Sequence, residues 1–278
     1  MDYLDRSSAP LTTEDWAALD NSVIAAARQQ LVGRKIIDVL GPLGGGVYSL
    51  PYSVFNSAGT AQVSLTGDED SEAITASERK MAQLPLVYKD FKLAWRNVET
   101  DRKLGLPLDV SAAAVAAAAL AVQEDKLIFR GNSELAQEGL LTVKGRCIAK
   151  ADDWEANGGA LASVVSAVSK LSAAGHYGPY ALAVSPELFG RMVRVYGTTG
   201  TLELEQIKAL IAGGVYSAGV LTGHEAVVVA TGMQNISLAV GKDIISAYLG
   251  PVNMNQLFRV LETCALLIRR PSAICTIE

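Results

Sequence analysis

The sequence is poor in the residues that build metal centres and disulfide frameworks. Its three cysteines, Cys147, Cys264 and Cys275, form no CxxC pair. An odd number of widely spaced cysteines is typical of reduced thiols in the cytoplasm, so we expect a cytoplasmic protein. The two histidines, His176 and His224, stand in separate glycine-containing turns and share no metal-ligand spacing. We therefore expect no metal site.

Positive charge and long apolar runs are also scarce. Lys and Arg number 24 against 29 Asp and Glu, which gives a net charge of −5 over 278 residues. A nucleic-acid coat needs an excess of cations to neutralise phosphates, so we expect no nucleic-acid partner. The most apolar segment, residues 110–122, is too short to span a bilayer, and the first residues do not form a signal segment. We expect no membrane partner either.

The motifs of common enzyme classes are missing as well. The glycine cluster 41–46 follows a short apolar run, but strand-like residues come next where a dinucleotide-binding turn would open a helix. We interpret it as a flexible hinge or hairpin entry. No P-loop GK[ST] and no GxSxG elbow occur, and the acidic run 68–70 favours a solvated loop over a cation site. Glu203 and Glu205 are expected to face solvent. Because none of these catalytic motifs is present, we predict that the chain is not an enzyme.

The sequence is rich in aliphatic residues, since half of it is hydrophobic while aromatic residues make up 6%. Helical spacing predicts helices over residues 11–33, 90–103, 111–129, 161–172, 186–196 and 202–212. Alternation or short apolar runs predict strands over residues 35–40, 47–50, 62–65, 180–184, 226–230, 236–240, 244–249, 257–267 and 273–277. Thr12 or Thr13 is expected to cap the first helix and Gly33 to stop it.

Residues 47–86 differ from the rest of the chain. Their short alternating pieces are separated by Gly59, Gly67 and the acidic run, and they contain few large apolar residues. A long two-stranded arm of this kind is only marginally stable alone. We therefore expect the arm to lie on a neighbouring molecule.

The remaining sequence suggests two packed lobes. The helix 111–129 carries Ala and Val on all faces in its first half, which predicts a buried spine, while residues 123–126 are expected to meet polar surroundings. A middle segment of about residues 140–250 alternates helices and strands and forms the second lobe. The strands 257–267 and 273–277 are expected to return to the first core.

Several segments resemble the encapsulins, bacterial shell proteins with the fold of tailed-phage major capsid proteins. Their order and spacing carry the resemblance, which runs from end to end of the chain. The segments are residues 4–11 (LDRSSAPL), 31–39 (LVGRKIIDV), 88–91 (YKDF), 107–111 (PLDVS), 124–131 (EDKLIFRG), 138–141 (EGLL) and 178–180 (GPY). Residues 88–95 and 271–278 are most similar to the branch whose shells hold ferritin-like, iron-storing cargo.

The resemblance implies an α+β fold with a peripheral domain, an axial domain and an extended loop. The implied division is 1–46 for the first helix and the start of the peripheral domain, 47–90 for the extended loop, 91–139 for the peripheral domain with its spine helix, 140–252 for the axial domain and 253–278 for the peripheral return strands. It also implies self-assembly into an icosahedral nanocompartment that encloses cargo.

Cargo proteins of the family dock on the inner wall through a C-terminal targeting peptide, near the first helix. The resemblance therefore points to Leu19, Val23 and Ile24 as an apolar stripe for this peptide, with Arg34 and Asp38 beside it. Two alternatives stay open: the stripe packs on its own domain, and Arg34 pairs with Asp38.

Two further sites are implied by the resemblance. Residues 196–203 would lie at a five-fold pore, whose loop is Tyr196, Gly197, Thr198, Thr199 and Gly200. This small, uncharged loop is expected to be mobile and weakly selective.

Trp95 corresponds to a tryptophan on which some encapsulins stack a flavin such as FMN, although interface packing is the favoured role here.

Two other interpretations of the whole chain remain. A tailed-phage capsid protein would package DNA and usually carries a leader, which we do not expect here. A flavin enzyme is disfavoured by the absence of catalytic groups.

Overall fold

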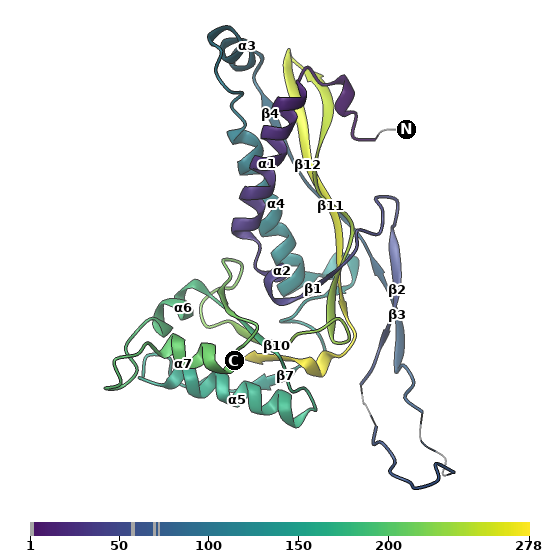
Figure 1. Ribbon diagram of the computed structural model, residues 1–278, viewed down its shortest axis with the longest axis vertical. Helices are drawn as coiled ribbons and strands as arrows, with labels where there is room; N and C mark the ends of the chain where they lie inside the picture. Colours follow the sequence, from purple (N-terminus) through teal and green to yellow (C-terminus); the bar gives the residue numbers. More distant parts are fainter. Residues whose placement is uncertain (1–2, 57–58, 69–70, 72) are drawn as a thin grey trace.

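The computed structural model describes residues 3–56, 59–68, 71 and 73–278, which form two lobes and a projecting arm (Figure 1). The helices of the described residues are α1 Thr13–Gln30, α2 Gly33–Ile36, α3 Trp95–Leu104, α4 Ser111–Arg130, α5 Gly159–Ala173, α6 Pro186–Met192 and α7 Glu203–Leu210, with 3-10 turns η1 Arg6–Ser8, η2 Ser133–Leu135 and η3 Pro271–Ala273. The strands are β1 Asp38–Leu40, β2 Ser49–Val54, β3 Glu78–Gln83, β4 Leu86–Leu93, β5 Gly131–Asn132, β6 Gln137–Glu138, β7 Cys147–Ala149, β8 Tyr180–Val184, β9 Val215–Ser217, β10 Ala226–Ala230, β11 Ile236–Val252, β12 Asn255–Ile268 and β13 Ile274–Ile277.

The first lobe is a four-stranded sheet with the order β1-β11-β12-β4, against which α1 and α4 pack (Figure 1). The paired strands β11 and β12 run along its whole length. Phe258 lies at the centre of its core, stacked on Phe91 with ring centroids 5.3 Å apart and edge-on to Trp16 at 5.7 Å. Aromatic pairs at these distances add to the stability gained from burial alone.

The second lobe is a five-stranded sheet with the order β7-β13-β10-β8-β9. Its central strands β8 and β10 are buried along their whole length, which explains their continuous apolar sequences. The helix α5 packs on this sheet, and the two form a second hydrophobic core. None of the helices in the described part of the chain is long and apolar enough to cross a bilayer.

The arm is the hairpin of β2 and β3 with the segment that joins them, and it projects away from the first lobe (Figure 1). At its base, Ala82 and Leu84 are buried against Leu267 of β12. At its far end Val63 and Leu65 are 96% and 107% exposed. The residues Glu69 and Asp70 of the acidic run lie outside the described residues.

Several sequence predictions of elements are wrong. Residues 62–65 form no strand, because the far end of the arm has no neighbour to pair with in one chain. Residues 90–93 belong to β4 rather than to a helix, since β12 provides an antiparallel partner for them. Residues 236–240 and 244–249 are parts of one strand, β11, with irregular pairing between Val240 and Lys242.

The expected return of residues 273–277 to the first core is also wrong. Strand β13 pairs antiparallel with β10 and parallel with β7, both in the second lobe. Conversely, β11 lies in the first-lobe sheet, although the expected division placed residues 140–252 in the axial domain. The chain therefore passes between the lobes more often than a linear division shows, and the last strand closes the second core.

Candidate docking groove

Helix α1 forms one wall of the candidate site, and its start is fixed by a capping box. The Asp15 backbone N–H donates to Thr12 Oγ1 at 3.1 Å, and the Thr12 N–H donates back to Asp15 Oδ2 at 2.9 Å. The sequence offered Thr12 or Thr13 as the cap, and Thr12 takes the role. The helix then packs on α4 (Figure 1).

The predicted cargo stripe is divided by this packing. Leu19 and Val23 are 0% and 1% exposed, because they face α4 in the first core. The prediction that these two residues contact a docked peptide directly is therefore corrected, because a peptide reaches them only if the core opens. Ile24, on the outer side of the same helix, is 41% exposed.

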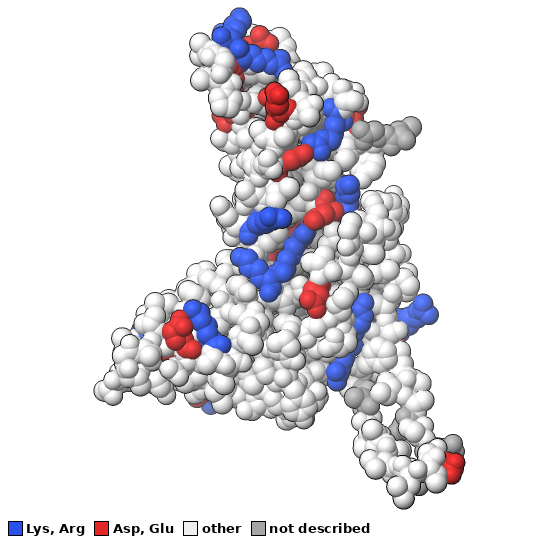
Figure 2. Space-filling model, in the orientation of Figure 1, with Lys and Arg blue, Asp and Glu red and all other residues white. Residues whose placement is uncertain are grey.

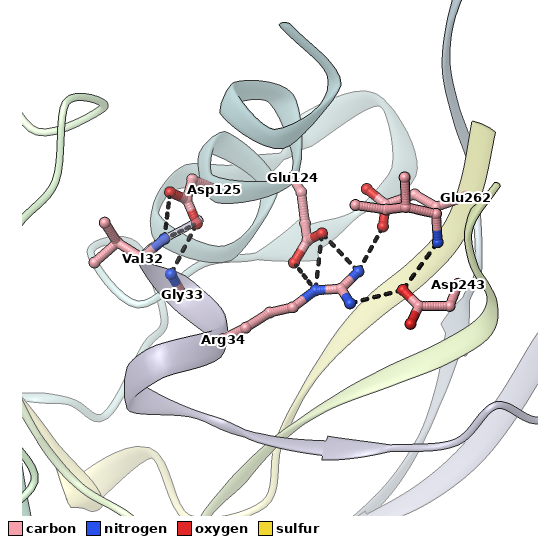
Figure 3. Close-up of polar contacts among 8 residues, drawn as sticks. Val32, Gly33, Arg34, Glu124, Asp125, Asp243 and Glu262 are labelled. Atoms are coloured by element: carbon pink, nitrogen blue, oxygen red, sulfur yellow. Dashed lines mark hydrogen bonds and ion pairs between the residues drawn. The ribbon is translucent and has the colours of Figure 1, made fainter. Parts of the chain in front are cut away.

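The chain turns sharply after α1, and a buried carboxylate holds the turn. Asp125 of α4 accepts hydrogen bonds from the backbone N–H groups of Val32 at 2.9 Å and Gly33 at 2.8 Å (Figure 3). Gly33 begins α2 rather than stopping α1, and a Cβ at this position would lie 2.3 Å from Ile128 Cδ1. Burial raises the pKa of Asp125 to about 6, although the two backbone hydrogen bonds act to lower it.

The turn places Arg34 in a buried network of carboxyl groups (Figure 3). Its guanidinium donates to Glu124 Oε1 at 2.8 Å and to Glu262 Oε2 at 2.7 Å, and both glutamates are 0% exposed. A third bond, 2.7 Å long, reaches the exposed Asp243 Oδ1. The expected pairing of Arg34 with Asp38 is wrong, because these three acids occupy the guanidinium. Glu124 meets the polar surroundings expected of residues 123–126, but it does so inside the protein, against Arg34, and not in solvent.

The protonation of the network follows from burial. Burial lowers the pKa of Arg34, but hydrogen bonds to Glu124 and Asp243 outweigh it, so the pKa is raised and the guanidinium stays charged. Burial, and then the charge of Glu124, raise the pKa of Glu262 well above its ordinary value. Burial thus favours the neutral form of Glu262 more than it does for an exposed glutamate. Its buried oxygen Oε1 has no hydrogen-bond partner among the described groups.

A groove of about 330 Å³ lies beside this network. Its lining combines apolar side chains from α1 and β11 with charged groups at the rim. The lining residues are Ile24, Ala27, Arg28, Leu31, Arg34, Lys35, Asp243 and Ile244. Figure 2 shows that, on the face drawn, charged side chains lie at mid-height over α1 and α2 and again at the top near α3, whereas much of the second lobe is white. The arm carries blue side chains beside β2 and β3 and a red one near its far end.

The structure brings together two of the predicted cargo residues, Ile24 and Arg34, and does not bring the others to the groove. Asp38 is exposed on β1 and is not part of the lining. Ala27 and Leu31 also line the groove and were missed; both are largely buried in the first core, at 2% and 5% exposure. No sequence signal points to the β11 residues of the wall, since their place depends on the sheet.

The predicted pore loop is a compact turn at one end of the second lobe. Gly197 and Gly200 adopt positive φ angles of 55° and 76°, a conformation that favours glycine. The turn closes through the Tyr196 N–H, which donates to the Thr201 carbonyl at 2.8 Å, while Thr199 Oγ1 donates to the Tyr196 carbonyl at 2.6 Å. Helix α6 ends at Met192, before this loop, and not at residue 196.

An ion pair fixes the base of this loop. Glu203 is 0% exposed, accepts a bond from Arg194 Nε at 3.1 Å and another from the Leu161 backbone N–H at 2.9 Å. The expectation that Glu203 faces solvent is therefore wrong, because it pairs with a cation nine residues away; Glu205 is exposed as expected. The loop itself carries no charged side chain.

Trp95 opens helix α3 and is 40% exposed. It borders a groove of about 290 Å³ together with Arg102 and Lys103. The Arg96 guanidinium lies 5.9 Å from the centre of the Trp95 ring. Among the described residues, no group of three or more His, Cys, Asp or Glu side chains is placed to hold a metal ion.

The two lobes, the long paired strands and the projecting arm define the class of tailed-phage capsid-like shell proteins. A virus-like particle subunit from Pyrococcus furiosus superposes with a TM-score of 0.76 and 19% identity, covering 96% of this chain and 99% of that one. The capsid protein of Myoviridae phage XM1 superposes with a TM-score of 0.61 and 10% identity, covering 86% and 88%. The expected α+β capsid fold is confirmed.

Within that class the family is also defined. A family model described as "Encapsulating protein for peroxidase" matches residues 1–265. The type 1 encapsulin shell protein EncA of Myxococcus xanthus is 46% identical over 277 residues, which cover 100% of this chain and 96% of that protein. This chain belongs to the encapsulin family, as its sequence segments suggested.

Proposed function

We propose that this chain is a shell subunit that assembles with copies of itself into a closed, icosahedral nanocompartment, with no catalytic activity of its own. The arm is the observation that carries this proposal, since Val63 and Leu65 project into solvent at its far end. Burying such side chains contributes about 1.5–3 kcal/mol each. A second copy is the natural cover, because repeated contacts close a symmetric shell. Membership of the encapsulin family supports the same function.

Assembly is tested by size-exclusion chromatography and negative-stain microscopy of the purified chain. We expect closed particles from the unchanged protein and small soluble species from a Val63→Asp/Leu65→Asp variant with an unchanged circular-dichroism spectrum. The matched control, Val63→Leu/Leu65→Val, keeps the apolar surface and should still form particles. A monomeric unchanged protein at high concentration would contradict the proposal. Particles rich in nucleic acid, by their absorbance ratio at 260 and 280 nm, would favour a DNA-packaging capsid instead.

We further propose that the groove beside α1 receives the C-terminal targeting peptide of a cargo protein. Ile24, Leu31 and Ile244 provide an apolar floor for its side chains, and the charged groups at the rim bind its backbone or charged flanks. The buried network behind Arg34 makes this wall rigid, so little ordering entropy is lost when a peptide binds.

The docking test uses two residues of equal exposure. Ile24→Asp should abolish co-purification of cargo while particles still form. Val39 is 43% exposed, close to the 41% of Ile24, but lies outside the groove, so Val39→Asp should load cargo normally. Equal loading of the two variants would remove the groove as the docking site. Leu19→Asp is a poor test, because it buries a carboxylate in the first core.

The loop 196–200 is proposed to line a pore through which small solutes pass. The small, uncharged residues 197–200 of the loop support this role. Thr198→Trp should slow turnover of an enclosed enzyme with external substrate, and equal rates would remove the assignment. An iron-oxidising guest in the cytoplasm remains the cargo we expect, with its metal ligands supplied by the guest.

A flavin on Trp95 is a second proposal, separate from the shell function. The half-exposed ring and the neighbouring cations Arg102 and Lys103 fit a flat aromatic group with a phosphate. A visible absorbance spectrum of gently purified particles should show flavin bands that weaken in Trp95→Ala. A spectrum without these bands would refute it.

A further inference from the structure

Two cysteines face each other across neighbouring strands of the second lobe. Cys147 of β7 and Cys275 of β13 are register partners in a parallel pair. Both side chains belong to the second hydrophobic core, whereas Ile148, the next residue of β7, is 47% exposed on the outer side. The two thiols therefore lie on the same face of the sheet.

The spacing suits a covalent bond between them. Neighbouring strands lie roughly 4.8 Å apart, and a disulfide joins Cα atoms separated by about 4.4–6.8 Å. Burial, and to a smaller degree the neighbouring Cys147 thiol, raises the pKa of Cys275 to about 12, in line with their register pairing. Cys275 is 0% exposed, while Cys147 is half-buried at the edge strand.

We propose that Cys147 and Cys275 form a dithiol site that hydrogen peroxide converts to an intramolecular disulfide. Cys147 reacts first, because it is the more accessible thiol. Its sulfur attacks one peroxide oxygen, so that an S–O bond forms, the O–O bond breaks and water leaves. The Cys275 sulfur then attacks the Cys147 sulfur, so that the S–S bond forms, the S–O bond breaks and a second water leaves. Two thiols are oxidised by two electrons and one peroxide is reduced.

The bond has a structural consequence because of where β13 lies. The chain leaves the first lobe through β12 and enters the second lobe as β13, between β7 and β10 (Figure 1). A disulfide to β7 fixes this last strand in the second core. A peroxide-exposed subunit would then be held against withdrawal of its C-terminal strand, and reduction would release it.

The test treats the purified full-length protein with hydrogen peroxide, alkylates the remaining thiols in denaturant and measures intact mass without reductant. We expect loss of two hydrogens, one alkylated cysteine per chain, and a peptide map that joins Cys147 to Cys275. Cys264 belongs to the first core, so Cys264→Ser should cross-link equally well. Cys147→Ser should lose the cross-link.

A second measurement tests the reduced pair directly. Phenylarsine oxide, a trivalent arsenical, binds two adjacent thiols with loss of one water, so one arsenical should bind per chain in the unchanged protein and none in Cys147→Ser. Oxidation of Cys147 to sulfinic acid without a cross-link would overturn the proposal. A disulfide between Cys147 residues of two copies, or a failure to bind the arsenical, would overturn it as well.

Discussion

Replacing Arg34 by Met tests the buried network at the base of the groove. Methionine keeps the aliphatic length of the side chain but removes the cation that Glu124 and Glu262 share. Both carboxyl groups are 0% exposed, so neither can turn to water without moving its helix or strand. The variant therefore leaves the Glu124 carboxylate buried without a cation.

The expected cost follows from that uncompensated charge. Removing one partner of a buried ion pair destabilises a protein by about 3–5 kcal/mol, which corresponds to a fall in Tm of roughly 6–20 °C for a chain of this size. An Arg34→Met/Glu124→Gln variant should recover much of the loss, since no buried charge remains.

Thermal unfolding followed by circular dichroism, at one protein concentration, measures these differences. Glu262→Gln is the matched control: because burial raises the pKa of Glu262 and so favours its neutral form, a neutral isostere should cost clearly less than Arg34→Met. A loss in Glu262→Gln as large as that in Arg34→Met would refute the reasoning. It would mean that Glu262 is ionised beside Arg34 in the native protein.

Other substitutions in the same region have separate outcomes. Thr12→Ala removes the capping box and should cost about 1 kcal/mol, whereas Thr13→Ala should change Tm little. Gly33→Ala forces a Cβ against the buried Ile128 and should cost about 1–3 kcal/mol, with partial recovery in Gly33→Ala/Ile128→Val. The pKa of Asp125 is raised from 3.8 to about 6, so its contribution to stability should be complete below pH 3.8 and be lost as pH rises through 6. Urea midpoints between these pH values should show a fall that Asp125→Asn lacks.

Much of the fold follows from local sequence signals. The spine helix, the strands β8 and β10 and the marginal arm were predicted from periodicity and composition, because each has a strong signal within a short window. The place of β13 was predicted wrongly, since an apolar strand fits either core equally well. The strand joins the second-lobe sheet because β7 and β10 offer hydrogen-bonding edges on both sides of it.

The candidate site could likewise be predicted only in part from the sequence. The resemblance located α1 and Arg34, and the helix periodicity grouped Leu19, Val23 and Ile24 as one stripe. It did not separate the exposed Ile24 from the buried Leu19 and Val23, because all three are aliphatic. The three acids around Arg34 come from separate elements, α4, β11 and β12, so no spacing in the sequence relates them.

The turn between α1 and α2 connects these observations. Asp125 binds its backbone from one side, while Glu124, the next residue of α4, holds Arg34 from the other. Consecutive residues of the spine thus fix both the path of the chain and the side chain at the edge of the groove. A fixed surface favours the docking that we propose for this groove, because less ordering entropy is lost when a peptide binds a preformed shape. The arm has the opposite property, since Val63 and Leu65 at its far end are fully exposed in the single chain.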